Sequence, residues 1–300
     1  MERIVVIGSS NVDTVIRVPH IPVSGETVMA KGVKVCFGGK GANQAAAIAR
    51  LGGDVSFIAC VGDDSFGDDM LHNFNEYGVK TGGVEQLADT HSGAAYIYVS
   101  DFGDNNIVVN AGANSQLTEG VVGKNINLFD DASYCLIQLE IPIETLYYVA
   151  EICREKSVKL ILDPAPVADL DFSRLKGTWM ITPNQAELDM LVPGNGNVIE
   201  KAITLQKKGF EYVLATLGDQ GSILVSESGA VNYSAARVSE VVDTTAAGDS
   251  FAGTLAFALS NGLNVDESIK IASEAAAITV SRAGAQPSLP VWSEVEVRCG

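Results

Sequence analysis

The stretch "RIVVIG", residues 3–8, is a short run of apolar, mostly β-branched residues that ends at a glycine. Similar runs follow at residues 54–60, 133–139, 158–163, 178–183 and 212–218. Helix-like segments separate them, such as "NQAAAIARLG", "IETLYYVAEICREK" and "NVIEKAITLQKKG". Continuously apolar strands that alternate with helices indicate βαβ units around a parallel sheet buried on both faces. The sequence therefore predicts an α/β fold.

Two regions do not follow this alternation. Residues 10–37 contain strand-like segments with Pro and Gly breaks, and residues 94–109 resemble a hairpin around "DFGDNN". We expect them to form a small antiparallel β-sheet that stands off a single domain of residues 1–300.

Composition narrows the classes of function. The chain has 20 Lys and Arg residues against 37 Asp and Glu residues, a formal net charge of −17. Such a surface repels phosphate backbones, so we expect neither nucleic acid nor anionic membrane as a partner. The N-terminal residues lack the pattern of a signal peptide and no apolar run approaches 18 residues, so we expect a cytoplasmic protein. The Cys and His spacings match no zinc motif.

Polar residues follow several of the predicted strands. In open α/β sheets, ligands bind beyond the carboxyl ends of the strands. A carboxylate directly after an apolar strand is costly unless it is paired or used. Each of these residues alone could be a helix cap or a loop residue, but together they predict a ligand site: Asn11, Asp13, Glu140, Asp163, Asn184 and Glu187.

The stretch "VVDTTAAGDSF", residues 241–251, precedes a helix-like segment. Small residues at a helix start leave backbone amides free, and these amides with the helix dipole favour an anion such as a phosphoryl group. Asp249 would lie in the first turn, where a carboxylate can accept the proton of an attacking hydroxyl. The alternative is an acidic residue that only stabilises the helix N-terminus.

A second glycine-rich stretch, "FGGKGANQAAA", covers residues 37–47. It is not a Walker A loop, since Gly41 rather than Ser or Thr follows Lys40, and Gly8 opens no dinucleotide-binding fingerprint. Backbone donors, an ammonium group and the amide of Asn43 at a helix start suit a polyhydroxyl ligand. The alternative is a plain tight turn with a solvated lysine.

Taken in order, "GGKGANQA", "QLE", "TPN", "TLG", "DTTAAGDSF" and "RAGAQPS" resemble the ribokinase family of carbohydrate kinases across nearly the whole chain. The resemblance implies a three-layer α/β/α sandwich around a mostly parallel sheet, with a protruding β-sheet lid formed by residues 10–37 and 94–109. It also implies a homodimer formed through the lids. Three positions depart from the common family pattern: Ala246 replaces a glycine, Ser273 stands where Asn or His is frequent, and Asp163 stands where Asn is common.

Matched position by position, the resemblance implies roles for individual residues. Asp249 would be the catalytic base, and Ala246, Ala247 and Gly248 would form the anion hole. Ribose would contact Asn11, Asp13, Gly39, Lys40, Asn43, Glu140 and Asp249. ATP would contact Asn184, Thr216, Gly218, Gly221, Gly248 and Ser273, with Glu187 near Mg²⁺. An activating monovalent cation, K⁺, would lie at Asp243, Thr245, Thr279, Arg282, Gly284 and Ser288.

The activity implied is ATP-dependent phosphorylation of D-ribose at its 5-hydroxyl. Related kinases for a nucleoside, fructose or a ketodeoxy sugar acid remain alternatives. So does a catalytically silent sugar-binding regulator, although such a protein has no need for a base at Asp249.

Overall fold

The computed structural model describes residues 2–299 and begins with strand β1 (Arg3–Ile7). Ile4 and Val6 point into one hydrophobic core, whereas Val5 and Ile7 point into a second core. Side chains of a strand alternate between the faces of a sheet, so β1 must be covered on both sides.

The main sheet has nine strands, parallel except at one end, where β12 runs antiparallel to both of its neighbours. Its spatial order is β13 (Gly229–Tyr233), β12 (Ser222–Ser226), β11 (Tyr212–Thr216), β10 (Met180–Ile181), β9 (Lys159–Leu162), β8 (Ala132–Ile137), β1, β4 (Val55–Gly62) and β5 (Lys80–Leu87). The runs predicted as strands all contribute to this sheet.

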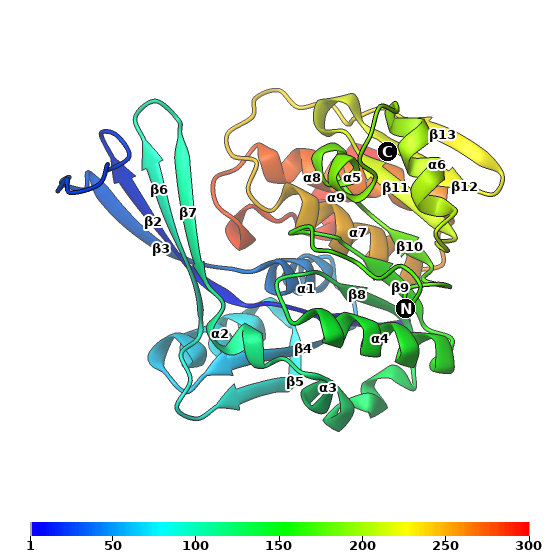
Figure 1. Ribbon diagram of the computed structural model, residues 1–300, viewed down its shortest axis with the longest axis horizontal. Helices are drawn as coiled ribbons and strands as arrows, with labels where there is room; N and C mark the ends of the chain where they lie inside the picture. Colours follow the sequence, from blue (N-terminus) through cyan, green and yellow to red (C-terminus); the bar gives the residue numbers. More distant parts are fainter. Residues whose placement is uncertain (1, 300) are drawn as a thin grey trace.

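Helices cover both faces of the main sheet (Figure 1). One face carries α3 (Glu119–Lys124), α4 (Ile143–Lys156), α5 (Gln185–Leu191) and α6 (Val198–Gln206). The other carries α1 (Lys40–Arg50), α2 (Ser65–Tyr77), α7 (Ala247–Ser260) and α8 (Val265–Val280), with α9 (Trp292–Cys299) packed on α8. The predicted three-layer sandwich is confirmed. Within residues 2–299, no helix combines the length and the apolar character that crossing a bilayer requires.

A second sheet of four strands stands away from the main body (Figure 1). Its order is β3 (Gly32–Gly38), β2 (Asn11–Val18), β6 (Gly93–Ser100) and β7 (Asn105–Asn110). Only residues 8–10 separate β1 from β2, so the chain passes directly from the main sheet into the small one. The carboxyl end of β1 is therefore the junction between the two sheets.

Candidate active site

The glycine-rich turn before α1 allows this helix to begin against the end of β1. Gly39, the N-cap, has a positive φ of 89°, and a Cβ there would lie 2.8 Å from the amide nitrogen of Asn11. A Cβ at Gly41 would lie 2.6 Å from the carbonyl carbon of Gly8. Only glycine fits these two positions, which bring Lys40 and Asn43 to the junction of the two sheets.

Two carboxylates face this junction. Glu140 accepts a hydrogen bond from the backbone amide of Lys40 at 3.1 Å. The carboxylate of Asp13, on β2, lies beside Gly38. A Cβ at residue 38 would lie 2.0 Å from Asp13 Oδ2, so only glycine leaves room for this carboxylate. Burial raises the pKa of Asp13 to about 7, with further contributions from Glu140 and Asp249.

Amide side chains complete this part of the site. Asn114 Nδ2 donates to Asn11 Oδ1 at 2.7 Å, and Asn114 Oδ1 accepts from the amide of Ser10 at 2.9 Å. Asn11, Asn114 and Glu140 line a cavity of about 410 Å³ beneath the small sheet, together with Val109, Ala111, Ser115, Ile141, Pro142 and Pro166. The cavity has the donors and acceptors that sugar hydroxyls need, beside an apolar wall.

Asp249 is buried in the first turn of α7 and faces α1. Its Oδ2 accepts from Asn43 Nδ2 at 2.8 Å, and its Oδ1 is 3.3 Å from Gln44 Nε2. The two helices approach closely at Gly253, where a Cβ would lie 2.8 Å from Ala47 Cβ. Burial raises the pKa of Asp249. Lys40, Asn43 and Gln44 oppose that rise, whereas Glu140 adds to it. The carboxyl therefore holds a proton more strongly than an exposed aspartate.

The start of α7 presents free backbone donors. Ala246, the N-cap, has a left-handed conformation with φ 60°, and no side chain caps the helix. The amide of Ala247 donates to Thr244 O at 3.3 Å. Within residues 2–299, no carbonyl outside the helix accepts from the amides of Gly248 and Asp249. Unpaired amides at a helix N-terminus suit an anionic group.

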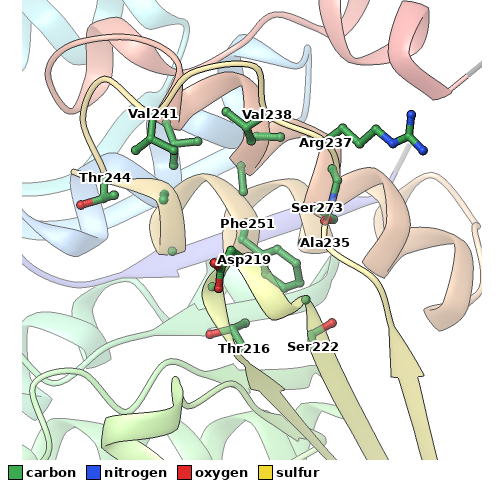
Figure 2. A pocket seen from close by; sticks show the side chains of 18 residues that line it. Thr216, Asp219, Ser222, Ala235, Arg237, Val238, Val241, Thr244, Phe251 and Ser273 are labelled. Atoms are coloured by element: carbon green, nitrogen blue, oxygen red, sulfur yellow. Dashed lines mark hydrogen bonds between the residues drawn. The ribbon is translucent and has the colours of Figure 1, made fainter.

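A larger cavity of about 660 Å³ adjoins this helix start (Figure 2). Five of the expected ATP contacts line it: Thr216, Gly218, Gly221, Gly248 and Ser273. Ser273 Oγ accepts from the amide of Ala236 at 3.0 Å, so this hydroxyl holds the loop that forms the cavity wall. Gly248 lines this cavity, whereas its neighbour Asp249 faces Asn43 and lines neither of the two cavities.

Asn184 and Glu187 form a capping box at the start of α5. Glu187 Oε2 accepts from the amide of Asn184 at 2.8 Å, and Glu187 Oε1 accepts from Asn184 Nδ2 at 2.7 Å. The backbone of Asn184 also forms an isolated parallel β-bridge with Thr216, which lines the larger cavity. Glu187 keeps free lone pairs for a hydrated ion, since each oxygen accepts only one of these bonds.

Asp243 accepts hydrogen bonds from two other residues of the segment expected to bind a monovalent cation, Thr245 and Gly284. Its Oδ1 accepts from the amide and hydroxyl of Thr245 at 2.9 and 2.6 Å, and its Oδ2 accepts from the amide of Gly284 at 2.9 Å. Burial opposes ionisation of Asp243, but these bonds and Lys34 lower its pKa overall.

The other expected cation ligands are engaged in different ways. Arg282 pairs with Glu294, with Nη2 2.5 Å from Oε1, so its guanidinium does not compete with a cation. Thr279 Oγ1 lies 2.8 Å from Ser250 Oγ, and Ser288 Oγ donates to Ala285 O at 2.6 Å.

Three side chains of the site were not predicted from the sequence: Gln44, Gln138 and Asn114. Gln44 belongs to the quoted "GGKGANQA" stretch, but nothing in the pattern shows that its side chain faces Asp249. Gln138 directly follows β8, but it lies inside the run 133–139 that was predicted as a strand, so the strand-end rule did not select it.

Comparisons with known proteins agree with this geometry. Residues 1–292 match the pfkB family of carbohydrate kinases. The ribokinase of Haemophilus influenzae is 38% identical to this chain over 297 residues, which cover 98% of this chain and 97% of the relative. The structure of Thermotoga maritima ribokinase superposes with a TM-score of 0.93 at 35% identity and covers 99% of both chains. Arabidopsis thaliana ribokinase, solved with ribose and ATP, has a TM-score of 0.94 at 30% identity and covers 99% of this chain and 98% of its own. A match of this extent, on a chain whose buried Asp249 lies beside the free amides of α7, means that this protein belongs to the pfkB family of carbohydrate kinases.

Proposed function

We propose that this protein transfers the γ-phosphoryl group of ATP to the 5-hydroxyl of D-ribose, which makes it a ribokinase. The observation that carries the proposal is the position of Asp249, buried beside the free amides of α7 and hydrogen-bonded to Asn43. The similarity to ribokinases over almost the full chain supports ribose as the sugar.

In this proposal the junction of the two sheets holds the sugar. Asn11, Asp13, Gly39, Lys40, Asn43 and Glu140 bind its hydroxyls, and Asn43 Oδ1 has no hydrogen-bond partner in residues 2–299 that would compete with the sugar. The 5-hydroxyl lies against Asp249. The O–H bond breaks with its proton moving to Asp249, the oxygen bonds to the γ-phosphorus, and ADP leaves. The anion hole at residues 246–248, in which the amide of Gly248 is free within the described chain, stabilises the negative charge that develops on the phosphoryl group.

ATP would occupy the cavity of about 660 Å³, and Glu187 would help to hold a hydrated Mg²⁺ near it. Bound Mg²⁺ offsets charge on the transferring phosphoryl group. A K⁺ ion at the Asp243 segment would hold the loop that leads into Ala246. Since ATP is made available in the cytoplasm, we place the enzyme there.

The small sheet acts as a lid in this proposal and as the interface between two protomers. Thr14 on β2 pairs with Val35 on β3 and with Tyr96 on β6, and Tyr96 pairs with Val108 on β7. These residues form a row on one face of the sheet, and Asp13 points to the opposite face. Val35, Tyr96 and Val108 are 53%, 43% and 60% exposed, an apolar surface that a second lid would cover.

The oligomeric state tests the lid interface. Light scattering is expected to give a dimer for the wild type and a monomer for the Val35→Asp/Val108→Asp double variant. A monomeric wild type at micromolar concentration refutes this interface.

The activity is tested by an ADP-release assay with ATP, Mg²⁺ and a panel of ribose, deoxyribose, fructose, nucleosides and a ketodeoxy sugar acid. We expect turnover with ribose, and faster turnover in K⁺ than with a bulky organic cation. Turnover on another compound of the panel alone would replace ribose as the substrate. Heat of ribose binding without any turnover would support a silent sugar-binding regulator.

A further inference from the structure

Asp163 is a buried carboxyl for which the proposed reaction has no direct use. It follows β9 and is 9% exposed. Its Oδ2 accepts from Gln44 Nε2 at 2.9 Å, and its Oδ1 accepts from the amide of Ala165 at 3.2 Å. The same Gln44 Nε2 is 3.3 Å from Asp249 Oδ1. Two carboxyl groups from different elements therefore share one side-chain amide.

The orientation of that amide is determined by a second glutamine. Gln138 Nε2 donates to Gln44 Oε1 at 2.6 Å, and both glutamines are fully buried. Because the donor faces the amide oxygen, Gln44 must direct its NH₂ group toward the carboxyls. Gly8 leaves the room for this arrangement, since a Cβ at that position would lie 1.9 Å from Gln138 Oε1.

Charged groups from several elements face this pair of carboxyls. Lys40, at the start of α1, is the cation that acts on both, and its pKa is raised because Asp163, Asp249, Glu140 and Glu187 outweigh the effect of its burial. Burial raises the pKa of Asp163 to about 7; Lys40 and the Ala165 amide oppose the shift, and Asp249 and Glu187 add to it. Asp249 is acted on by Lys40, Asn43, Gln44 and Glu140, and Asp13 lies at the same junction.

We propose that Asp163 is a positioning residue that acts on Asp249 through the shared amide of Gln44 and sets the pH range in which Asp249 accepts the hydroxyl proton. This inference rests on the proposed function. An ionised Asp163 repels an ionised Asp249 and competes for the Gln44 donor, so Asp249 holds a proton more strongly. Asp163 itself neither gives nor takes a proton in the transfer step.

Two variants of the network test this with opposite expected signs. Asp163→Asn removes the charge and keeps the shape, so the acid limb of kcat against pH should move to lower pH by about one unit. Gln44→Met removes a donor to Asp249, so the acid limb should move to higher pH. Asp69→Asn is the matched control, because it makes the same charge change at an exposed position on α2 and should leave the limb in place.

A second measurement needs no turnover. The ¹³Cγ signals of labelled aspartates can be titrated without substrates, with Asp249 assigned by its loss in Asp249→Asn. The Asp249 signal should titrate at lower pH in Asp163→Asn than in the wild type. An unchanged Asp249 titration, or an acid limb that moves the same way in both network variants, overturns the inference. A wild type without sugar kinase activity refutes only the proposed function, and the titration still decides whether the two carboxyls are coupled.

Discussion

Replacing Asp249 by Asn should remove turnover, and the stability of the variant relative to the wild type should rise with pH. A positioned general base contributes about 10²–10⁴-fold to the rate. Its loss should therefore lower kcat by that factor, or raise the activation barrier by about 3–5 kcal/mol. Sugar binding should persist, because Asp249 is one of several groups that contact the ligand.

The hydrogen bonds around Asp249 permit this substitution. Asp249 accepts from Asn43 and Gln44, whereas an asparagine in its place could accept only one bond and would present an NH₂ group to the other neighbour. Asn43 Oδ1 has no partner in residues 2–299, so a flip of the Asn43 amide supplies the missing acceptor. The flip directs Asn43 Nδ2 to the buried position where its Oδ1 had no partner, so the substitution leaves one buried donor unpaired in the sugar-free protein.

The rise in relative stability with pH follows from the buried charge. Burial raises the pKa of Asp249 in the folded state above its ordinary value of 3.8, so the folded state binds this proton more tightly than the unfolded state. Ionisation of Asp249 therefore lowers the free energy of unfolding as pH rises above that value. Asn carries no charge, so its contribution to stability does not fall as pH rises. The difference between variant and wild type should therefore be larger at neutral pH than near pH 4.

The assays are ADP release for kcat, calorimetry for ribose binding and thermal unfolding at both pH values. Asp249→Ala is the matched comparison: it also removes the base but strands the donors of Asn43 and Gln44, at a cost of about 1–3 kcal/mol each. A kcat for Asp249→Asn within tenfold of the wild type refutes the role of Asp249 as base. A stability difference between Asp249→Asn and the wild type that is the same at both pH values refutes the account of the buried charge.

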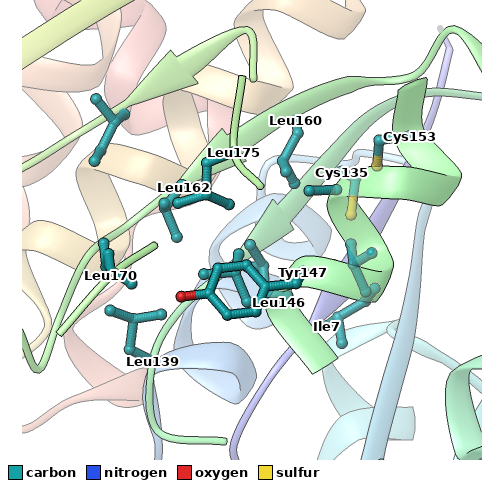
Figure 3. Close-up of a cluster of buried hydrophobic side chains, with 14 of the residues drawn as sticks. Ile7, Cys135, Leu139, Leu146, Tyr147, Cys153, Leu160, Leu162, Leu170 and Leu175 are labelled. Atoms are coloured by element: carbon teal, nitrogen blue, oxygen red, sulfur yellow. The ribbon is translucent and has the colours of Figure 1, made fainter. Parts of the chain in front are cut away.

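Three further outcomes are expected. Gly38→Ala should raise KM for the sugar strongly, because the added Cβ would lie 2.0 Å from Asp13 Oδ2. Gly32→Ala on the same strand, where a Cβ would have nothing within 4 Å, should leave KM unchanged. Equal KM values for the two variants in steady-state kinetics contradict this. The pKa of Asp13 is raised to about 7, and the ionised carboxylate is the better acceptor for hydroxyls. Sugar affinity measured by calorimetry should therefore increase as pH rises through 7, and Asp13→Asn should abolish that dependence. Leu146→Ala should lower the free energy of unfolding in urea by about 2–5 kcal/mol, because Leu146 is fully buried in the cluster of Figure 3. Val297→Ala, at an 82% exposed position, should change this free energy little. Similar values for the two variants would show that this cluster does not limit stability.

Much of the fold could be predicted from local patterns. The run at residues 3–8 is apolar after its first residue, and a strand buried on both faces needs such a run. Residues 143–156 show helical periodicity and form α4 over the same range. The hairpin expected within residues 94–109 occurs as β6 and β7. The edge strand β13 was not predicted, because its residues are mostly exposed and lack a strong apolar pattern.

The sequence alone determined which elements form and which polar residues follow the strands, since backbone preference and hydrophobic periodicity act over a few neighbouring residues. Only the tertiary structure decided which polar groups meet. Gln44 contacts Asp163 and Asp249 across 119 and 205 residues of chain. That contact exists because α1 packs on α7 at Gly253 and because Gln138 orients the Gln44 amide. Hydrogen bonds between distant elements depend on ångström-scale packing of the assembled layers, and no local pattern encodes that distance.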